Sequence, residues 1–82
     1  MKLSRDLSAG DLIKVLAKRG YVVTRQKGSH IRLTTQQNGE HHLTIPNHDP
    51  LMVGTLSGIL RDVADHFGIA REELVKELIG GK

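Results

Sequence analysis

The run that most constrains the fold is residues 29–35, within which polar and apolar side chains alternate one by one from His30 to Thr34. Ile31 and Leu33 fall on one side of this run, as in a strand that buries a single face. The opposite side carries polar residues only: His30, Arg32 and Thr34. A strand of this kind belongs to an antiparallel sheet with one face on a core and the other in water.

Turn signals and β-branched residues predict one further strand on each side of this run. Residues 21–25, Tyr-Val-Val-Thr-Arg, read as the first strand, and residues 26–28 as the turn that follows it. Asn38-Gly39 is a strong hairpin signal and leads into a third strand at about residues 40–46. Its apolar residues are Leu43 and Ile45, and its outward residues are His42 and Thr44. The sequence therefore predicts a three-stranded antiparallel meander with one apolar face.

Apolar residues at helical spacing predict helices before and after the strands. The first helix covers about residues 8–19 and begins at Ser8, whose spacing from Asp11 is that of a capping box. The second begins at Thr55, the expected N-cap, and ends at Gly68. A third, shorter helix is predicted at about residues 71–80.

Length and element order define the fold class. The 82 residues suffice for one small domain, residues 1–82, with its core at about 8–67 and a C-terminal helical extension at about 71–80. Two helices covering the apolar face of the sheet give an α+β fold whose other face stays open. A chain of this size buries only about 60% of its unfolded surface, so a site would be a shallow patch on that open face.

Positive charge is concentrated in the first half of the chain. The net charge is +3, but residues 1–39 hold eight Lys or Arg against two acids, while residues 40–82 hold four against seven. Between Lys14 and Arg32 there are six positive charges and no acid. Such a basic face is typical of nucleic-acid binding, although an ordinary solvated face is the alternative.

Several functions are disfavoured by what the sequence lacks. It has no cysteine, no apolar run of signal-peptide length and no segment that could span a bilayer, which favours a cytoplasmic protein without membrane partners. Tyr21 and Phe67 are its only aromatic residues apart from histidine. Binding of single strands by base stacking is therefore poorly supported, and contacts to the nucleic-acid backbone are favoured.

Two blocks of sequence resemble the signature of HicA-type mRNA interferase toxins. The first is Gly28-Ser29-His30 behind a basic turn, and the second is residues 45–48, Ile-Pro-Asn-His, followed by Gly54-Thr55-Leu56. They lie at the spacing usual in that family, after a first helix that ends in Lys-Arg-Gly-Tyr, and the resemblance covers about residues 8–70. It implies a double-stranded-RNA-binding-like α-β-β-β-α fold, which matches the order derived above.

The same resemblance implies an activity and partners. The activity is that of a ribosome-independent endoribonuclease that cleaves mRNA, the toxin of a toxin–antitoxin pair. The partner implied is a HicB-type antitoxin, which covers the active face within a larger hetero-oligomer. That complex would bind operator DNA mainly through the antitoxin.

The family resemblance assigns the catalytic role to His30. RNA carries its own nucleophile, the 2′-hydroxyl, so cleavage requires removal of its proton, protonation of the leaving oxygen and stabilisation of charge on the phosphate. An imidazole with an ordinary pKa of about 6.5 suits proton transfer, so neither a metal nor a cofactor is expected. Lys27 and Arg32 would hold the phosphate. Ser29 would add a hydrogen bond, and Gly28 would let the backbone approach the substrate.

The sequence does not determine which group performs the second proton transfer. His42, across the hairpin, is one candidate and His48 another, but His48 is also suited to orienting its loop, and His41 and His42 can equally be an exposed pair without a role. A metal site built from His30, His42 and His48 is disfavoured because their spacing matches no ligand pattern. A non-catalytic double-stranded-RNA-binding module is the alternative function, since the fold and the basic face alone support it equally well.

Overall fold

The structure, a computed structural model, describes residues 7–80, with side chains for residues 7–77. Its elements are, in chain order, α1 (Ala9–Ala17), β1 (Val22–Lys27), β2 (His30–Thr35), β3 (His41–Pro46), α2 (Val53–Phe67) and α3 (Arg71–Gly80). The strands form one sheet in the order β1-β2-β3, and both neighbouring pairs are antiparallel. The predicted α+β class and the three-stranded meander are therefore confirmed.

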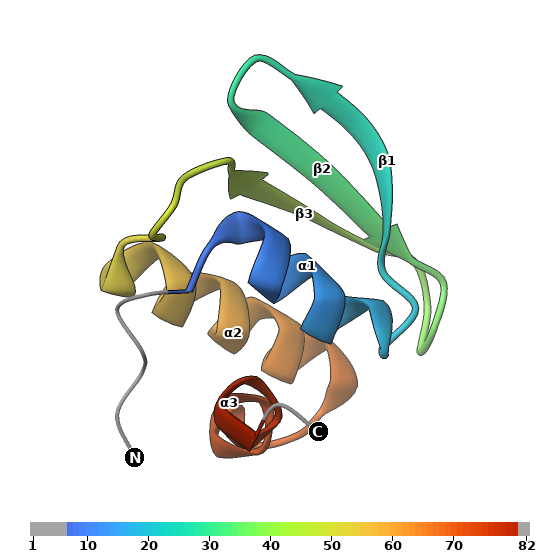
Figure 1. Ribbon diagram of the computed structural model, residues 1–82. Coiled ribbons are helices and arrows are strands. Elements are labelled where there is room, and N and C mark those ends of the chain that lie inside the picture. Colours follow the sequence, from blue (N-terminus) through green and yellow to red (C-terminus); the bar gives the residue numbers. More distant parts are fainter. Residues whose placement is uncertain (1–6, 81–82) are drawn as a thin grey trace.

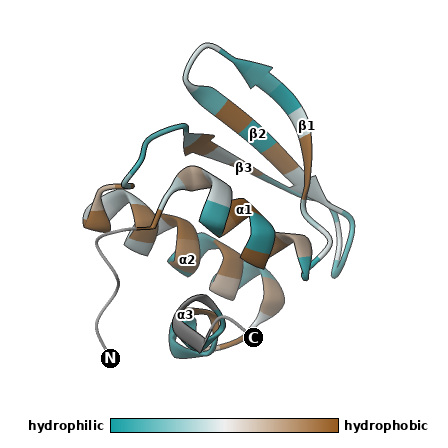
Figure 2. Cartoon of the chain, viewed as in Figure 1, coloured by the Kyte–Doolittle hydropathy of each residue, from teal (hydrophilic) through white to brown (hydrophobic). Residues whose placement is uncertain are grey.

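The helices cover only one face of the sheet. Figure 1 shows α1 and α2 on the same side of the strands, with α3 farthest from the sheet, while the other face stays open. Figure 2 shows the alternation along β2 as bands of brown and teal, with the hairpin end of β1 teal. Ile31 and Leu33 are buried and their neighbours His30 and Arg32 are exposed, so the predicted faces are correct for these four residues. Thr34, predicted among the outward residues, is buried.

One continuous core holds these layers together. It draws large apolar side chains from all three helices and from the covered face of β2 and β3. Those that are fully buried are Leu12, Leu16, Tyr21, Leu33, Ile45, Leu56, Leu60, Val63 and Leu74. Burial of each such side chain contributes about 1.5–3 kcal/mol, so this core is the main source of stability. No helix in the described part of the chain has the length and apolarity that crossing a membrane requires.

The start of α1 follows its sequence signal. The Ser8 hydroxyl accepts a hydrogen bond from the Asp11 backbone N–H, and the Asp11 carboxylate accepts one from the Ser8 N–H, both at 3.1 Å. The capping box is thus complete, and the hydrogen bond from the Ser8 N–H, followed by the effect of the Ser8 hydroxyl, holds the pKa of the Asp11 carboxyl below its ordinary value. The helix ends ahead of Gly20, whose φ of +83° favours glycine.

The predicted start of α2 is wrong. The helix begins at Val53 with Met52 as its N-cap, and no side chain caps it, so Thr55 lies within the first turn instead of ahead of it. The chain is already fixed just before this point, because Leu51 is buried and its N–H donates to the Leu7 carbonyl at 2.7 Å. Tertiary anchoring therefore decides where the helix begins, in place of a local cap.

The predicted turn at residues 26–28 is also wrong in its bounds. Gln26 and Lys27 belong to β1, and the hairpin closes over only two residues, Gly28 and Ser29. At the end of α2 the prediction is confirmed, since Gly68 takes the left-handed conformation with φ +66°.

Candidate functional site

The β1–β2 hairpin positions the residues of the sequence-predicted site. Lys27 lies directly opposite His30, and Gly28 and Ser29 connect them. Gly28 has a φ of +56° and Ser29 does not have a positive φ, which is the pattern of a type II′ hairpin turn with glycine at its first position. The sequence therefore specifies a tight turn, and that turn presents His30 at the very start of β2.

The segment after β3 fixes this turn from its other side. The Asn47 N–H donates a hydrogen bond of 2.6 Å to the Ser29 carbonyl, and Pro46 is the cross-strand neighbour of His30 on β3. His30 thus lies between Lys27 on one strand and Pro46 on the other. Its side chain is exposed on the face that the helices leave open.

An irregularity in β1 changes which of its residues face outward. Val23 pairs with Leu33 and Arg25 pairs with Arg32, so Thr24 is an extra residue in β1. Such a bulge shifts the alternation of side chains by one residue. Strict alternation from Val23 would put Arg25 on the same side of the sheet as Val23 and its partner Leu33, whereas the observed pairing puts Arg25 on the open face beside Arg32.

The bulge therefore gathers a basic patch around His30. Its four members are exposed and lie on the open face at the hairpin end of the sheet. We call this group, defined as Arg25, Lys27, His30 and Arg32, the hairpin patch. No carboxylate in the described part of the chain forms an ion pair with any of the four. Lys27, His30 and Arg32 are predicted from the sequence, but Arg25 is not, because nothing in the local sequence signals the bulge.

His42 lies at the opposite end of the open face. It pairs with Thr34, four residues along β2 from His30, which corresponds to about 13 Å at a strand rise of about 3.3 Å per residue. Its Nδ1 is 2.8 Å from the Thr34 hydroxyl and its Nε2 is 2.8 Å from the Glu40 carboxylate. The structure therefore does not bring His42, one of the two candidates for the second proton-transfer group, next to His30.

His48 lies closer along the chain than His42 to Pro46, the strand neighbour of His30. Its N–H donates to the Pro46 carbonyl at 2.9 Å, only two residues from the strand neighbour of His30. Its own carbonyl accepts the Ala9 N–H at 3.1 Å, so the His48 backbone also helps to hold the start of α1. The side chain is exposed.

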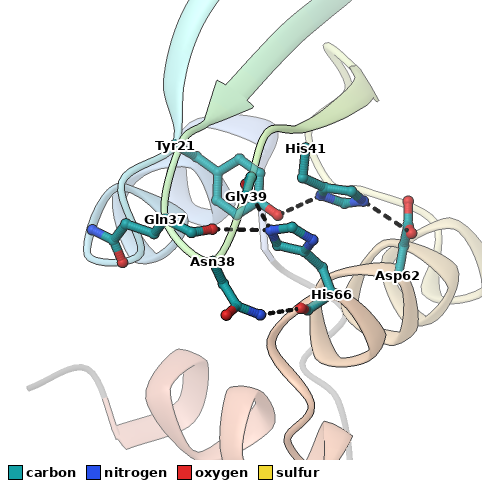
Figure 3. A network of polar contacts seen from close by, with 7 residues as sticks. All are labelled: Tyr21, Gln37, Asn38, Gly39, His41, Asp62 and His66. Carbon is teal, nitrogen blue, oxygen red and sulfur yellow. Dashed lines mark hydrogen bonds and ion pairs between the residues drawn. The ribbon is translucent and has the colours of Figure 1, made fainter.

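A second polar cluster lies at the other end of the molecule, shown in Figure 3. The Tyr21 hydroxyl is 2.6 Å from Nδ1 of His41, and Nε2 of His41 is 3.2 Å from the Asp62 carboxylate. His41 is only partly exposed, so the interpretation of His41 and His42 as an exposed pair is wrong. Burial, and secondarily the charge of Asp62, raises the pKa of Tyr21 to about 12.

His66 joins the same cluster from α2. Its Nε2–H donates to the carbonyls of Gln37 at 2.9 Å and Gly39 at 3.1 Å, and its ring stacks on that of His41 at 4.4 Å. The Asn38 side-chain amide donates in return to the His66 carbonyl at 2.7 Å. These bonds fasten the β2–β3 turn to the end of α2. We therefore interpret the cluster as structural support away from the hairpin patch.

No group of three or more metal-ligating side chains lies together within the described residues. The arrangement that remains is a three-stranded sheet backed by helices, with a basic, histidine-bearing open face. This is the fold of double-stranded-RNA-binding-like α+β proteins, and a basic face of this kind is typical of proteins that bind nucleic acids.

Residues 9–64 match the family model of the HicA toxin of bacterial toxin–antitoxin systems. Because the match covers more than half of the chain, the protein belongs to the HicA toxin family. Membership makes it the toxin of a toxin–antitoxin pair, in a family whose toxins are mRNA-cleaving RNases and whose partner is a HicB antitoxin. Comparisons with curated proteins and with solved structures gave no match.

Proposed function

We propose that this protein is a ribosome-independent endoribonuclease that cleaves mRNA in the cytoplasm, with His30 as the catalytic residue. Family membership supports the class of reaction. The single observation that carries the assignment of the residue is the position of His30, exposed on the open face and directly opposite Lys27. It is the imidazole of the open face that lies among positive charges.

The chemistry follows from the substrate. The 2′-hydroxyl of RNA attacks the adjacent phosphorus, forming a new P–O bond as the bond to the 5′-oxygen of the next nucleotide breaks. His30 acts either by accepting the 2′-hydroxyl proton or by donating a proton to the departing 5′-oxygen. Excess negative charge develops on the phosphate oxygens during this step, and a fixed cation beside them lowers the barrier.

The neighbours of His30 supply this stabilisation in our proposal. Lys27 faces His30 across the hairpin, and Arg32 is the next outward residue on β2, so both can reach a phosphate bound at His30. Ser29 is held by the 2.6 Å bond from Asn47 to its carbonyl, which leaves its hydroxyl available as a donor to the phosphate. Gly28 has no atom within 4 Å of the place where a Cβ would stand, so RNA can approach the turn closely.

The second proton-transfer group is proposed to be His48. It follows the cross-strand neighbour of His30 by two residues, whereas His42 lies about 13 Å away along the sheet. A HicB-type antitoxin is proposed to cover the open face within a hetero-oligomeric complex. Operator DNA is then bound through the antitoxin, which leaves the hairpin patch for RNA.

Cleavage of a defined RNA by the purified protein without ribosomes tests the proposal. We expect His30→Ala to abolish cleavage while RNA binding is retained, since the cations of the hairpin patch remain. His42→Ala is the matched control, because it removes an exposed histidine from the same face and should leave cleavage near the wild-type rate.

Unchanged cleavage by His30→Ala would refute the catalytic assignment. RNA binding by the wild type without any cleavage would instead favour the non-catalytic double-stranded-RNA-binding module. Undiminished activity in EDTA is expected, because no metal takes part in the proposed step.

A further inference from the structure

The bulge at Thr24 places two arginines directly opposite each other. Arg25 and Arg32 are cross-strand partners, and both are exposed on the open face. Cβ atoms of such partners lie about 4.5–5.5 Å apart, and like charges at this distance destabilise a sheet. No carboxylate in the described residues offsets the pair. The chain alone therefore leaves an unbalanced concentration of positive charge at this position.

The spacing of this pair from His30 matches the repeat of an RNA backbone. Arg25 and Arg32 lie two residues along the strands from Lys27 and His30, a separation of about 6.6 Å at the usual strand rise. Successive phosphates of an extended nucleic-acid strand are separated by a similar distance. A strand that follows the hairpin can thus place the scissile phosphate at Lys27 and His30, within reach of Arg32, and the next phosphate at Arg25.

The patch ends beyond the second pair. The next outward position is filled by Thr24 and Thr34, whose hydroxyls are 3.1 Å apart. Beyond these, Glu40 contacts His42 at 2.8 Å and places a carboxylate at the far end of the face. Positive charge on the open strands is therefore confined to two successive positions.

We infer that Arg25, brought onto the open face by the bulge and paired with Arg32, binds the backbone phosphate next to the scissile one. This inference rests on the proposed function, because it takes RNA as the substrate. It assigns Arg25 a role in binding and in alignment of the strand, with no proton transferred. The unrelieved repulsion between the two arginines is then a feature of the free protein that a bound phosphate removes.

The test measures binding of a fluorescent 2′-O-methyl RNA oligonucleotide, which lacks the nucleophile and is not cleaved. We expect Arg25→Gln to weaken binding several-fold at low salt. It should also reduce the slope of log K against log salt by about 0.7, the value for one phosphate contact to a single strand. Lys76→Gln is the charge-matched control, since Lys76 is exposed on α3, away from the open face, and should leave the slope unchanged.

The stability of Arg25→Gln is a second measurement. If Arg25 had a structural role, the substitution would lower the stability. Urea unfolding of Arg25→Gln should be unchanged or shifted to higher urea, because the substitution removes a like-charge pair. Arg25→Lys should restore most of the affinity.

If Arg25→Gln has the same slope of log K against log salt as the Lys76→Gln control, the inference is overturned. Loss of affinity accompanied by loss of stability would also overturn it, because Arg25 would then be a structural residue. Because the oligonucleotide is not cleaved, these results do not depend on whether His30 is catalytic. Failure of the cleavage assay and failure of this assay are therefore distinguishable.

Discussion

Tyr21 is a single side chain that serves both the core and a polar network. Its ring is fully buried and contacts Phe67 edge-on at 6.2 Å, while its hydroxyl lies 2.6 Å from Nδ1 of His41. Nε2 of His41 donates its hydrogen to the Asp62 carboxylate, so in the neutral imidazole Nδ1 is the acceptor. The Tyr21 O–H therefore donates to Nδ1. The folded state therefore requires the neutral phenol.

This requirement predicts alkaline unfolding. The pKa of Tyr21 is raised from its ordinary value of about 10 to about 12 in the folded protein, so its contribution is fully present below pH 10 and is lost as the pH rises through about 12. A shift of this size corresponds to about 3 kcal/mol at most. As the chain has one tyrosine and no tryptophan, ultraviolet absorbance of the phenolate reports this titration directly.

Urea unfolding followed across the same pH range gives the matching stability. Tyr21→Phe is the control, because it removes the phenol and should abolish this part of the pH dependence. A tyrosine that titrates at its ordinary value in the folded protein would contradict the prediction.

At the scale of single elements, signals within the sequence predicted most of the fold. The alternation from His30 to Leu33 identified β2 and its two faces, and Ser8 identified the start of α1. The bulge could not be predicted, because Thr24 and its neighbours are exposed and include no glycine. The start of α2 was misplaced because Leu51, fixed by a contact to Leu7 far along the chain, determines it.

Some residues of the candidate site could likewise be predicted from local sequence, and others could not. Lys27, His30 and Arg32 could be predicted from a local turn and a local alternation, and the structure brings them together. Arg25 could not, since its face depends on the bulge. His66 contacts Gln37 and Gly39 in the β2–β3 turn, although these residues lie 29 and 27 positions away from it in the sequence. No local sequence pattern signals such contacts.

Replacing the glycine of the hairpin turn should lower the stability, whereas replacing a glycine within a helix should raise it. Gly28→Ala should destabilise the protein by about 1–3 kcal/mol, because φ at this position is +56° although no atom would clash with the new methyl group. Gly58→Ala, in α2 with equally open surroundings, should stabilise it by about 0.5–1 kcal/mol. Urea unfolding measures both. Equal effects of the two substitutions would contradict the role of the turn conformation.

At the scale of the whole molecule, α3 closes the core from the side opposite to the open face. The family match ends at residue 64, ahead of this helix, yet Leu74 and Val75 are buried in the common core. An ion pair of 2.7 Å between Arg19 and Glu77 also joins α3 to the end of α1. One nitrogen and one oxygen of this pair are buried without partners, so desolvation offsets part of its attraction. Apolar burial is then the main contribution of α3.

Leu74→Ala separates this structural contribution from the chemistry of the open face. It should lower the free energy of unfolding by about 2–5 kcal/mol, because it leaves a cavity where Leu74 is fully buried. Cleavage measured well below the melting temperature should stay near the wild-type rate, since Figure 1 places α3 on the far side of the helices from the sheet. Glu72→Ala, at an exposed position of the same helix, is the control and should change stability by less than about 0.5 kcal/mol.

Unchanged stability of Leu74→Ala would show that α3 is dispensable for the core. Loss of cleavage by a variant that remains folded would show instead that α3 acts on the hairpin patch.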